Sequence, residues 1–376
     1  MSVYDINGAE LLDLYSLSDN INMAYDINGN PVFDPYLDNR LLIFEDNFTS
    51  INPDVWTAEV GAMRGLPYFR ENNISIENGK LVITIKKENH AEKEWTSGSL
   101  ITRGKKSWMY GRFEAKAKLD TIAEFNKAYW FLGNTIAETF WNDDGTRDFL
   151  PQRTGIENNT GWSECGEIDV YETQSNVYRP QCNLWNATGQ SISYAEFPTN
   201  INTMDWHIYA MEWTPDYIAM FIDGTEYKRW TFSDYSYDVI KAYKTEPQSI
   251  LFGIGINDWI LPQNPHTEGK MWVDWVRVYA EAGVTAPIVE QSISIQSAMR
   301  LKRGYVAYTA PVILPLNTSD RSVTWSSDNT SIVRCENGFI YGIALGETDI
   351  HVTSKHGFTS TCHVTVINPD DPVILT

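Results

Sequence analysis

The sequence has little histidine, cysteine or positive charge, and each shortage argues against a class of protein. Six histidines and four cysteines occur in 376 residues, without a CxxC pair or a His/Cys cluster, so a zinc site is not expected. The cysteines are too few for a disulfide scaffold, and they allow three full pairings (Cys165, Cys182, Cys335 and Cys362). Acidic residues outnumber basic ones by 49 to 29, and a net charge of −20 repels phosphate backbones and anionic lipid headgroups. Nucleic acids and membrane surfaces are therefore poor candidate partners, whereas a neutral sugar is not excluded.

Long apolar runs are also absent. No segment approaches the ~18 apolar residues that a membrane-spanning helix needs, so membrane insertion is not expected. Residues 1–20 carry neither a basic leader nor an apolar stretch, so no secretory signal peptide is predicted. We therefore expect either a mature secreted form or a protein that leaves its cell by another route, with an extracellular, surface-attached or virion-attached location.

Aromatic residues, by contrast, are abundant, with 14 tryptophans and 20 tyrosines. Such a surplus has two interpretations: large β-sheet cores, or flat apolar faces that stack on ligands. Sheet packing accounts for most of these residues whatever the function is.

Stretches with helical periodicity are almost absent, and short β-branched and aromatic runs take their place. Alternation with a period of two over 81–86 and 112–119 is typical of strands with one buried face. The ENGK and IDGT sequences carry the Asn-Gly and Asp-Gly signals of tight hairpins. The pattern therefore predicts an all-β sandwich with a sizeable core.

Changes in composition divide the chain into four parts. Residues 1–40 are polar and turn-rich, and we interpret them as a leader or docking segment that contacts an assembly partner. Residues 41–281 form the all-β body. Residues 282–290 break the strand pattern and predict a linker, with few contacts across the boundary. Residues 291–369 predict a small second β-sandwich, with strands near 291–296, 305–309, 322–326, 339–341, 348–353 and 361–367.

One segment, GWSECGEIDVYE at 161–172, concentrates three carboxylates. On a regular strand alternate side chains share a face, so Glu167 and Asp169 point the same way and Glu172 points away. One extra residue in a β-bulge brings Glu172 onto the face of the other two. Two carboxylates about 5–5.5 Å apart are what a retaining glycosidase uses, one as nucleophile and one as acid/base. The alternative is an exposed, solvated strand, because Glu-x-Asp-x-x-Glu arises by chance in acidic proteins.

Five segments, in order over about 41–281, resemble family 16 glycoside hydrolases, the laminarinase, lichenase and agarase group. GEIDVYE matches the family's E-[IL]-D-x-x-E signature in its bulged form, and the preceding GWSEC is similar to the G-W-P-x-C of laminarinases. The other matches are YGRFEAKAKL, KAYWFLG, the HIYAMEWTPDYIAMFIDG hairpin and the closing MWVDWVRVY strand. The resemblance implies a concanavalin-like β-jelly-roll with a catalytic cleft, and hydrolysis of internal β-linkages with retention of configuration.

The same resemblance implies roles for individual residues. Glu167 aligns with the nucleophile, Glu172 with the acid/base, and Asp169 with the assisting carboxylate between them. Further residues are implied to contact substrate, with sheet packing as the alternative for the aromatic ones: Trp130, Trp162, Trp185, Trp259 and Arg64.

No cofactor is required for this chemistry, but the resemblance implies a structural calcium ion. Asp274 aligns with the residue that holds it, and Gly79 would offer a backbone carbonyl. Asn47 stands where a glutamate is usual. A lone aspartate among carbonyls suits the oxygen preference of calcium. The alternative for Asp274 is a solvated aspartate at a strand end.

Two departures from the family pattern leave the polysaccharide open. Trp185 replaces a histidine that is common in laminarinases, and residues 134–160 form a long insertion before the catalytic strand, where a loop borders the cleft. We expect a β-1,3-glucan or mixed β-1,3/1,4-glucan substrate, with an agar or carrageenan as the alternative. A virion- or surface-attached depolymerase remains a further alternative. So does an inactive carbohydrate-binding protein, although the three carboxylates argue against it.

The C-terminal part carries a second resemblance. Its WSSDNTSIV run, its NG hairpin and its G-x-T-x-I strand resemble bacterial Ig-like domains of group 2. Such modules usually act as spacers or adhesive attachments, and the resemblance implies the same here.

Overall fold

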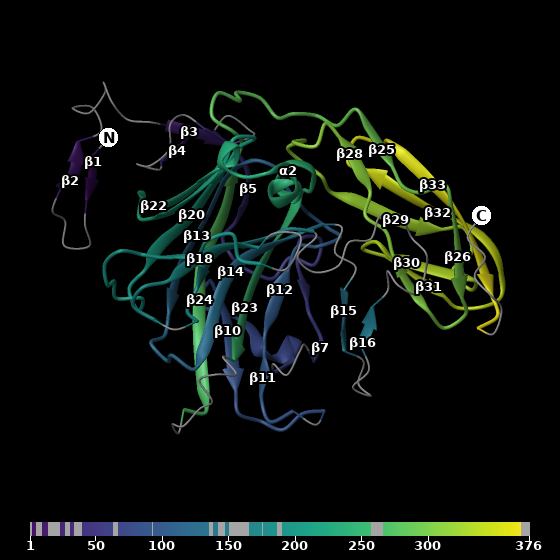
Figure 1. The fold of residues 1–376 in the computed structure, drawn as a ribbon, viewed down its shortest axis with the longest axis horizontal. Coiled ribbons are helices and arrows are strands. Elements are labelled where there is room, and N and C mark those ends of the chain that lie inside the picture. The colour runs from purple at the N-terminus through teal and green to yellow at the C-terminus, as the bar shows by residue number, and fades with distance from the viewer. Residues whose placement is uncertain are drawn as a thin grey trace.

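The structure is a computed structural model. It describes residues 40–62, 67–91, 93–134, 165–174, 176–185, 190–256 and 266–369, together with the backbone of short strands at 2–4, 10–13, 23–26, 31–33, 138–141 and 147–149. Strands dominate the described residues, as the sequence predicted (Figure 1). No helix in these ranges has the length and apolar character needed to cross a membrane.

The first large sheet carries the acidic segment. Its seven described strands lie in the order β19 (Ala195–Glu196), β18 (Gln181–Trp185), β17 (Glu167–Glu172), β14 (Phe125–Gly133), β23 (Gln248–Ile256), β12 (Ser99–Ile101) and β6 (Thr57–Ala58). We call this the catalytic sheet, after the role that the sequence analysis expects for the acidic segment. The strand β17 lies inside it, antiparallel to β14 on one side and to β18 on the other.

The second large sheet forms the other layer. Its main path runs β16 (Arg147–Phe149), β15 (Glu138–Trp141), β7 (Gly61–Ala62), β8 (Tyr68–Phe69), β11 (Thr96–Ser97), β10 (Lys80–Lys86), β24 (Glu268–Tyr279), β13 (Gly111–Leu119), β20 (His207–Trp213), β21 (Tyr217–Ile222) and β22 (Thr225–Thr231). Off this path lie β3 (Met23–Asp26), β4 (Pro31–Phe33), β5 (Leu41–Asp46) and β9 (Ile74–Glu77). The short helices are α2 (Tyr237–Ile240), α3 (Ala242–Thr245) and the 3-10 turns Glu71–Asn73 and Phe232–Asp234.

Both predicted hairpins are present. Asn78 and Gly79 have positive φ angles of 53° and 69° between β9 and β10, and Asp223 and Gly224 have 49° and 76° between β21 and β22. Left-handed values at both turn residues match the right-handed twist of the paired strands, which is why Asn-Gly and Asp-Gly occur there.

One hydrophobic core fills the space between the two sheets. Buried aromatic and β-branched side chains from both layers pack in it, including Tyr129 and Ile168 of the catalytic sheet and Phe113 and Met211 of the second sheet. The rings of Tyr129 and Phe252 stack at a centroid distance of 4.9 Å. The predicted β-sandwich is therefore confirmed.

The C-terminal strands form small sheets around a separate core. One sheet has the order β26 (Ala298–Lys302), β33 (Thr359–Ile367), β32 (Gly346–Ser354) and β29 (Val323–Ser327); another has β27 (Val306–Tyr308), β31 (Phe339–Gly342) and β30 (Val333–Glu336); and β25 (Ser292–Ser294) pairs with β28 (Val312–Leu314). We call this unit the C-terminal module. The sequence predicted six of these strands and missed the short ones β26, β28 and β30.

Contacts across the boundary are more extensive than the linker predicted. Leu316 of the C-terminal module packs against the core of the sandwich, and Asn317 donates a hydrogen bond to Glu281 at 3.4 Å. The hydroxyl of Tyr308, which is fully buried, donates to the backbone carbonyl of Asn134 at 2.9 Å. The linker composition gave no sign of these contacts, because they join surfaces that are distant in sequence.

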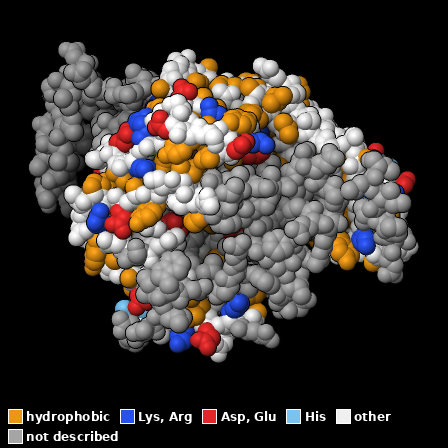
Figure 2. Space-filling view, viewed as in Figure 1, with side chains coloured by type: hydrophobic (Ala, Val, Ile, Leu, Met, Phe, Trp, Pro, Cys, Tyr) orange, Lys and Arg blue, Asp and Glu red, His pale blue; other side chains and the backbone are white. Residues whose placement is uncertain are grey.

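The N-terminal segment also meets the sandwich. The backbone of β3 pairs in parallel with β5, so part of residues 1–40 extends the second sheet. Among the described strands, β1 (Ser2–Tyr4) and β2 (Glu10–Asp13) pair with each other and join neither large sheet. In the space-filling view, acidic, basic and hydrophobic side chains are interspersed on the described surface (Figure 2). On this face they do not gather into a patch of a single sign.

Candidate active site

The predicted bulge lies in β17. Asp169 pairs with Trp130 of β14 and Tyr171 pairs with Tyr129, so Val170 is the extra residue on that side. The pairing with β18 shows the same interruption between Asp169 and Glu172. A one-residue bulge reverses the alternation of side chains along a strand, and here it does so between the second and third carboxylates.

The bulge sorts the strand into two sets of side chains. Ile168, Val170 and Tyr171 are at most 1% exposed and belong to the core between the sheets. Glu167, Asp169 and Glu172 are outside that core and share the outer face of the catalytic sheet, which we call the catalytic face. The prediction that Glu172 joins the other two carboxylates on one face is therefore confirmed.

Neutral donors hold the carboxylate of Glu172. Asn126, on the neighbouring strand β14, donates its amide N–H to Oε1 at 2.8 Å, and Gln174 donates to both carboxylate oxygens at 3.0 Å. Burial raises the pKa of Glu172, and the two amide donors oppose this rise without cancelling it. Glu172 therefore keeps a proton to higher pH than an ordinary glutamate does. The sequence analysis missed both amides, although Gln174 lies only two residues beyond the signature.

Asp169 is 1% exposed and lies between the two glutamates. Burial holds its pKa well above the usual range, and the negative charges of Glu172 and Glu167 add to the rise. The indole Nε1–H of Trp185 donates to Oδ2 of Asp169 at 3.0 Å and acts in the opposite direction. Asp169 is therefore set up to remain protonated, in contact with a neutral donor.

Trp185 is placed on the catalytic face and is half-buried. It pairs with Glu167 across β17 and β18, so the two side chains leave the sheet on the same side. The alternative of packing between the sheets is wrong for this residue, because its strand neighbours Cys182 and Leu184 occupy the core positions. Its indole N–H donates a hydrogen bond to Asp169, the middle of the three carboxylates.

Tyr243 in α3 supports the backbone beneath these side chains. Its buried hydroxyl lies 2.5 Å from the carbonyl oxygen of Trp185 and 3.1 Å from that of Glu167. One tyrosine thus ties the ends of β17 and β18 together at the position of Glu167.

An apolar cluster continues the catalytic face toward β12. Trp130 is half-buried and packs against Leu132, Cys165, Ile101 and Leu251. Because Trp130 pairs with Asp169 in the sheet, its ring lies beside the carboxylates. Trp130 therefore combines packing with a partly exposed aromatic surface next to the site.

Beyond this cluster lies a fourth carboxylate that the sequence analysis missed. Glu59 follows β6, is 5% exposed, and accepts a hydrogen bond from Ser99 at 2.6 Å. Arg103 lies 3.8 Å from its other oxygen. Burial raises the pKa of Glu59, against the opposing effects of Arg103 and Ser99. Ala58 and Leu100 contact the core, so by alternation Glu59 and Ser99 lie on the catalytic face.

The residues predicted for calcium do not fit it. The carboxylate of Asp274 forms ion pairs with Lys80 and with Lys116, the latter at 3.0 Å, and two ammonium groups repel a cation. Gly79 is the second residue of the β9–β10 turn, and Asn47 is exposed just after β5. Among the residues that the structure describes, no group of three or more His, Cys, Asp or Glu side chains is placed to bind a metal. The lysines could not be foreseen, because the register of β10, β13 and β24 brings them to Asp274.

The remaining predictions of substrate contact lie outside the described residues. These are Trp162, Trp259 and Arg64. Of the insertion at 134–160, the backbone of β15 and β16 is described as a hairpin that pairs with β7. All four cysteines are described, and none forms a disulfide.

Comparison with known proteins finds relatives for the two-sheet part of the chain. Residues 151–277, which include β17 and its bulge, match the sequence profile "Glycosyl hydrolases family 16". The structure of an endo-β-1,3-glucanase from Pyrococcus furiosus superposes with a TM-score of 0.53 at 26% identity, over 65% of this chain and 96% of that one. The two-sheet part of this chain is therefore similar in sequence and fold to family 16 glycosyl hydrolases.

Two characterised relatives are similar over the same part. A β-glucanase from Rhodothermus marinus is 29% identical over 257 residues, which are 63% of this chain and 84% of the relative. The clotting factor G alpha subunit of Tachypleus tridentatus is 27% identical over 266 residues, 67% of this chain. The chain spans only 36% of the length of that second relative.

Proposed function

We propose that this protein is a retaining endo-glycoside hydrolase that cleaves internal β-linkages of a β-1,3-glucan or a mixed β-1,3/1,4-glucan. The observation that carries the proposal is the bulge in β17, which brings Glu167, Asp169 and Glu172 onto one face with neutral donors around them. A structural strand of an acidic protein has no need of this arrangement, since it buries like charges beside one another at a cost in stability.

The first half of the reaction follows from the two glutamates. An oxygen of the ionised Glu167 attacks the anomeric carbon, the bond from that carbon to the leaving oxygen breaks, and Glu172 gives its proton to that oxygen. The raised pKa of Glu172 suits it to this role, because the proton must still be bound near neutral pH. The product is a glycosyl ester of Glu167 and a free chain end.

The second half reverses the roles. Water attacks the anomeric carbon, its proton passes to the now ionised Glu172, and the ester bond to Glu167 breaks. Two inversions give net retention. Asp169 assists by staying protonated between the glutamates, where a further negative charge would disturb the ionisation of both. This chemistry needs no metal or cofactor.

The substrate class is inferred from similarity and charge. The relatives named above include a β-glucanase and an endo-β-1,3-glucanase. A net charge of −20 disfavours a sulfated polysaccharide such as carrageenan, because both molecules are anionic. Trp130 and Trp185 are both half-buried, and each offers a partly exposed ring on which a neutral pyranose can stack. A substrate of this size also supports a location outside the cell or on a surface, with residues 1–40 as the attachment.

The test is a panel of laminarin, lichenan, agar and carrageenan with product mapping and measurement of anomeric configuration. We expect internal cleavage of one or both β-glucans with retention. Cleavage of carrageenan alone would replace the substrate assignment, and inverted products would overturn the mechanism. Binding to a β-glucan without hydrolysis by the wild-type chain would identify a carbohydrate-binding protein instead.

A further inference from the structure

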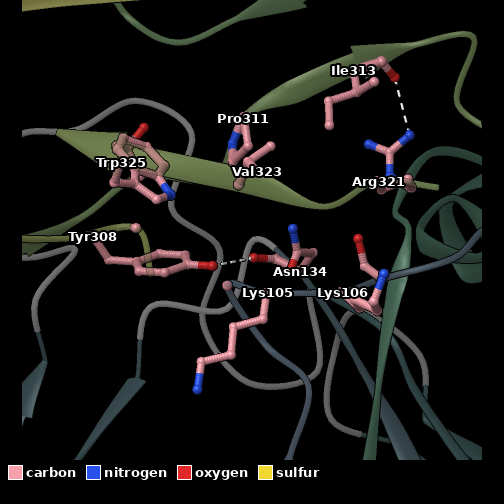
Figure 3. A pocket seen from close by; sticks show the side chains of 13 residues that line it. Lys105, Lys106, Asn134, Tyr308, Pro311, Ile313, Arg321, Val323 and Trp325 are labelled. Atoms are coloured by element: carbon pink, nitrogen blue, oxygen red, sulfur yellow. Dashed lines mark hydrogen bonds between the residues drawn. The ribbon is translucent and has the colours of Figure 1, made fainter. Parts of the chain in front are cut away.

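The C-terminal module contacts the catalytic sheet at the residue where β14 ends. Asn134 directly follows β14, and its backbone carbonyl accepts the hydrogen bond from Tyr308 at 2.9 Å (Figure 3). Tyr308 belongs to β27 of the module and is fully buried, and burial raises the pKa of its hydroxyl to about 12. A buried hydroxyl of this kind is costly to leave unpaired, so the hydrogen bond fixes the relative position of the two units.

Asn134 is in turn fixed to the catalytic sheet. Its backbone N–H donates to the carbonyl of Pro247 at 2.8 Å, and its side-chain oxygen accepts from Ser249 at 3.3 Å. The preceding Gly133 donates to the carbonyl of Gly166, the residue before Glu167. The path from Tyr308 to the proposed nucleophile therefore crosses only short hydrogen-bonded steps.

The end of β14 and the residues just before β17 lie in direct backbone contact, so neither can shift without moving the other. A Cβ atom at Gly133 would lie 2.0 Å from the carbonyl oxygen of Cys165, so the two backbones are in direct contact. Leu132 pairs with Glu167 one step further along. A shift of Asn134 is therefore passed to the start of β17 rather than absorbed by side chains.

A second contact joins the module to the turn after β12. Gly104 has a φ of 76°, and a Cβ atom there would lie 2.3 Å from the carbonyl oxygen of Asn337. The guanidinium of Arg103 lies 5.8 Å from the centre of the Phe339 ring and pairs with Glu59 on the catalytic face. The module thus contacts the ends of two strands of the catalytic sheet.

One ion pair crosses the interface, and a second one within the module shares its carboxylate. Asp320 of the module lies between Lys106, at 3.3 Å, and Lys355, at 2.7 Å. Burial acts against the ionised form, but the two lysines hold the pKa of Asp320 below its usual range. The interface therefore combines charged contacts with the apolar packing of Leu316 and differs from a flexible linker.

We propose that the C-terminal module positions the catalytic site, with Tyr308 as the positioning residue that holds the end of β14 and, through it, the start of β17. This inference rests on the proposed function for its effect on turnover, but not for the structural coupling itself. The module then belongs to the working enzyme, and its role is not that of an independent spacer.

The test uses the full-length Tyr308→Phe variant, which keeps the ring against Phe339 and removes only the hydroxyl. Tyr341→Phe is the matched control, because the ring of Tyr341 stacks with Arg334 inside the module. We expect amide hydrogen exchange to become about five- to tenfold faster at Gly133 and over 165–172 in Tyr308→Phe, the effect of losing one buried hydrogen bond. Exchange in β21 should not change. Equal exchange in the variant and the control, or a uniform rise across the sandwich, would overturn the inference.

Gly104→Ala tests the second contact against Gly304→Ala. Both positions have positive φ, 76° and 83°, but a Cβ atom at Gly304 meets nothing within 4 Å. The strain is therefore shared, and only Gly104→Ala pushes the module away. We expect Gly104→Ala to accelerate exchange at β12 and Gly133, whereas an effect equal to that of Gly304→Ala would count against the coupling.

Steady-state kinetics test whether the contact between the C-terminal module and β14 affects catalysis. For laminarin we expect Tyr308→Phe to lower kcat about fivefold with KM changed by less than twofold, because the contact holds the proposed nucleophile, and Tyr341→Phe to change neither. Unchanged kinetics with altered exchange would show that the contact positions the backbone without affecting catalysis, which overturns the catalytic part of the inference. If the wild-type chain hydrolyses no β-glucan, the proposed function fails while the exchange result still decides the coupling.

Discussion

The pKa values of carboxylates shift in opposite directions on the two outer faces of the sandwich. On the catalytic face, burial raises the pKa values of Asp169 and Glu172, and the neutral indole and amide donors oppose this rise without cancelling it. On the outer face of the second sheet, Asp274 binds Lys80 and Lys116, and its pKa falls although burial acts in the other direction. The difference teaches that deep burial without a cationic partner favours the protonated carboxylate, whereas two lysines keep a less buried carboxylate ionised.

The strongest way to sharpen this comparison is to remove the proposed nucleophile. Glu167→Gln should lower turnover of laminarin by several orders of magnitude while the fold persists, because no covalent intermediate can form. Asp274→Asn, on the opposite face, should leave turnover almost unchanged. Azide should rescue Glu167→Ala and give a glycosyl azide of inverted configuration. Normal hydrolysis by Glu167→Gln would refute the assignment.

Removing the proposed acid should have the next largest effect. Glu172→Gln should lower kcat on laminarin by about 10²–10⁴-fold, the usual contribution of general acid catalysis. The loss on an aryl β-glucoside with an activated leaving group should be far smaller, because that leaving group needs no proton. The ratio of the two losses is the measurement. Equal losses on both substrates would show that Glu172 is not the acid.

A smaller effect is expected at Trp185. Trp185→Phe keeps an aromatic ring but removes the N–H that donates to Asp169, and we expect kcat/KM on laminarin to fall about tenfold, as for one hydrogen bond in a buried site. Trp185→His restores a donor and should recover part of the loss. If Phe and His behave alike, the ring matters and the hydrogen bond does not.

The pH dependence of stability should have opposite signs at the two aspartates. The folded pKa of Asp169 lies above its ordinary value of 3.8, so this group stabilises the fold only at low pH and its contribution is lost as the pH rises through the raised pKa. Asp169→Asn cannot ionise. The Tm of Asp169→Asn should therefore increase relative to that of the wild type as the pH rises above about 4. A constant difference between pH 4 and pH 8 would mean that Asp169 ionises normally.

At Asp274 the pH dependence of stability should have the opposite sign, and this is the smallest effect that we expect. Its folded pKa lies below 3.8, so its contribution is present above that value and is lost as the pH falls through the lowered pKa. Because the pair is partly exposed, Asp274→Asn should cost no more than about 1 kcal/mol at pH 7 and less at pH 3. Chemical denaturation at the two pH values measures this, and a larger cost at pH 3 would contradict it.

The sequence predicted the parts of the site that depend on local order. Three carboxylates within six residues fix their relation along one strand, and the bulge follows from the need to place Glu172 with the others. The hairpins at Asn78 and Asp223 follow in the same way from the backbone that each turn requires. Such features depend on neighbours in the chain and can be inferred without the fold.

What the sequence could not predict depends on register between distant strands. Asn126 reaches Glu172 from β14, and Lys80 and Lys116 reach Asp274 from β10 and β13. Each of these contacts changes the chemistry of a carboxylate that the motif had already identified. Tyr308 and Asn134 are 174 residues apart in the chain, so the sequence around either residue does not reveal their contact.

The bulge at Val170 also makes the length of β17 subject to selection. A substitution in this strand changes one side chain, but an insertion or deletion exchanges the faces of every residue beyond it and sends Glu172 into the core. Natural variation within 167–172 should therefore proceed by replacement alone. A library that diversifies this segment must keep its six-residue length, and recombination between relatives should place its crossovers outside it.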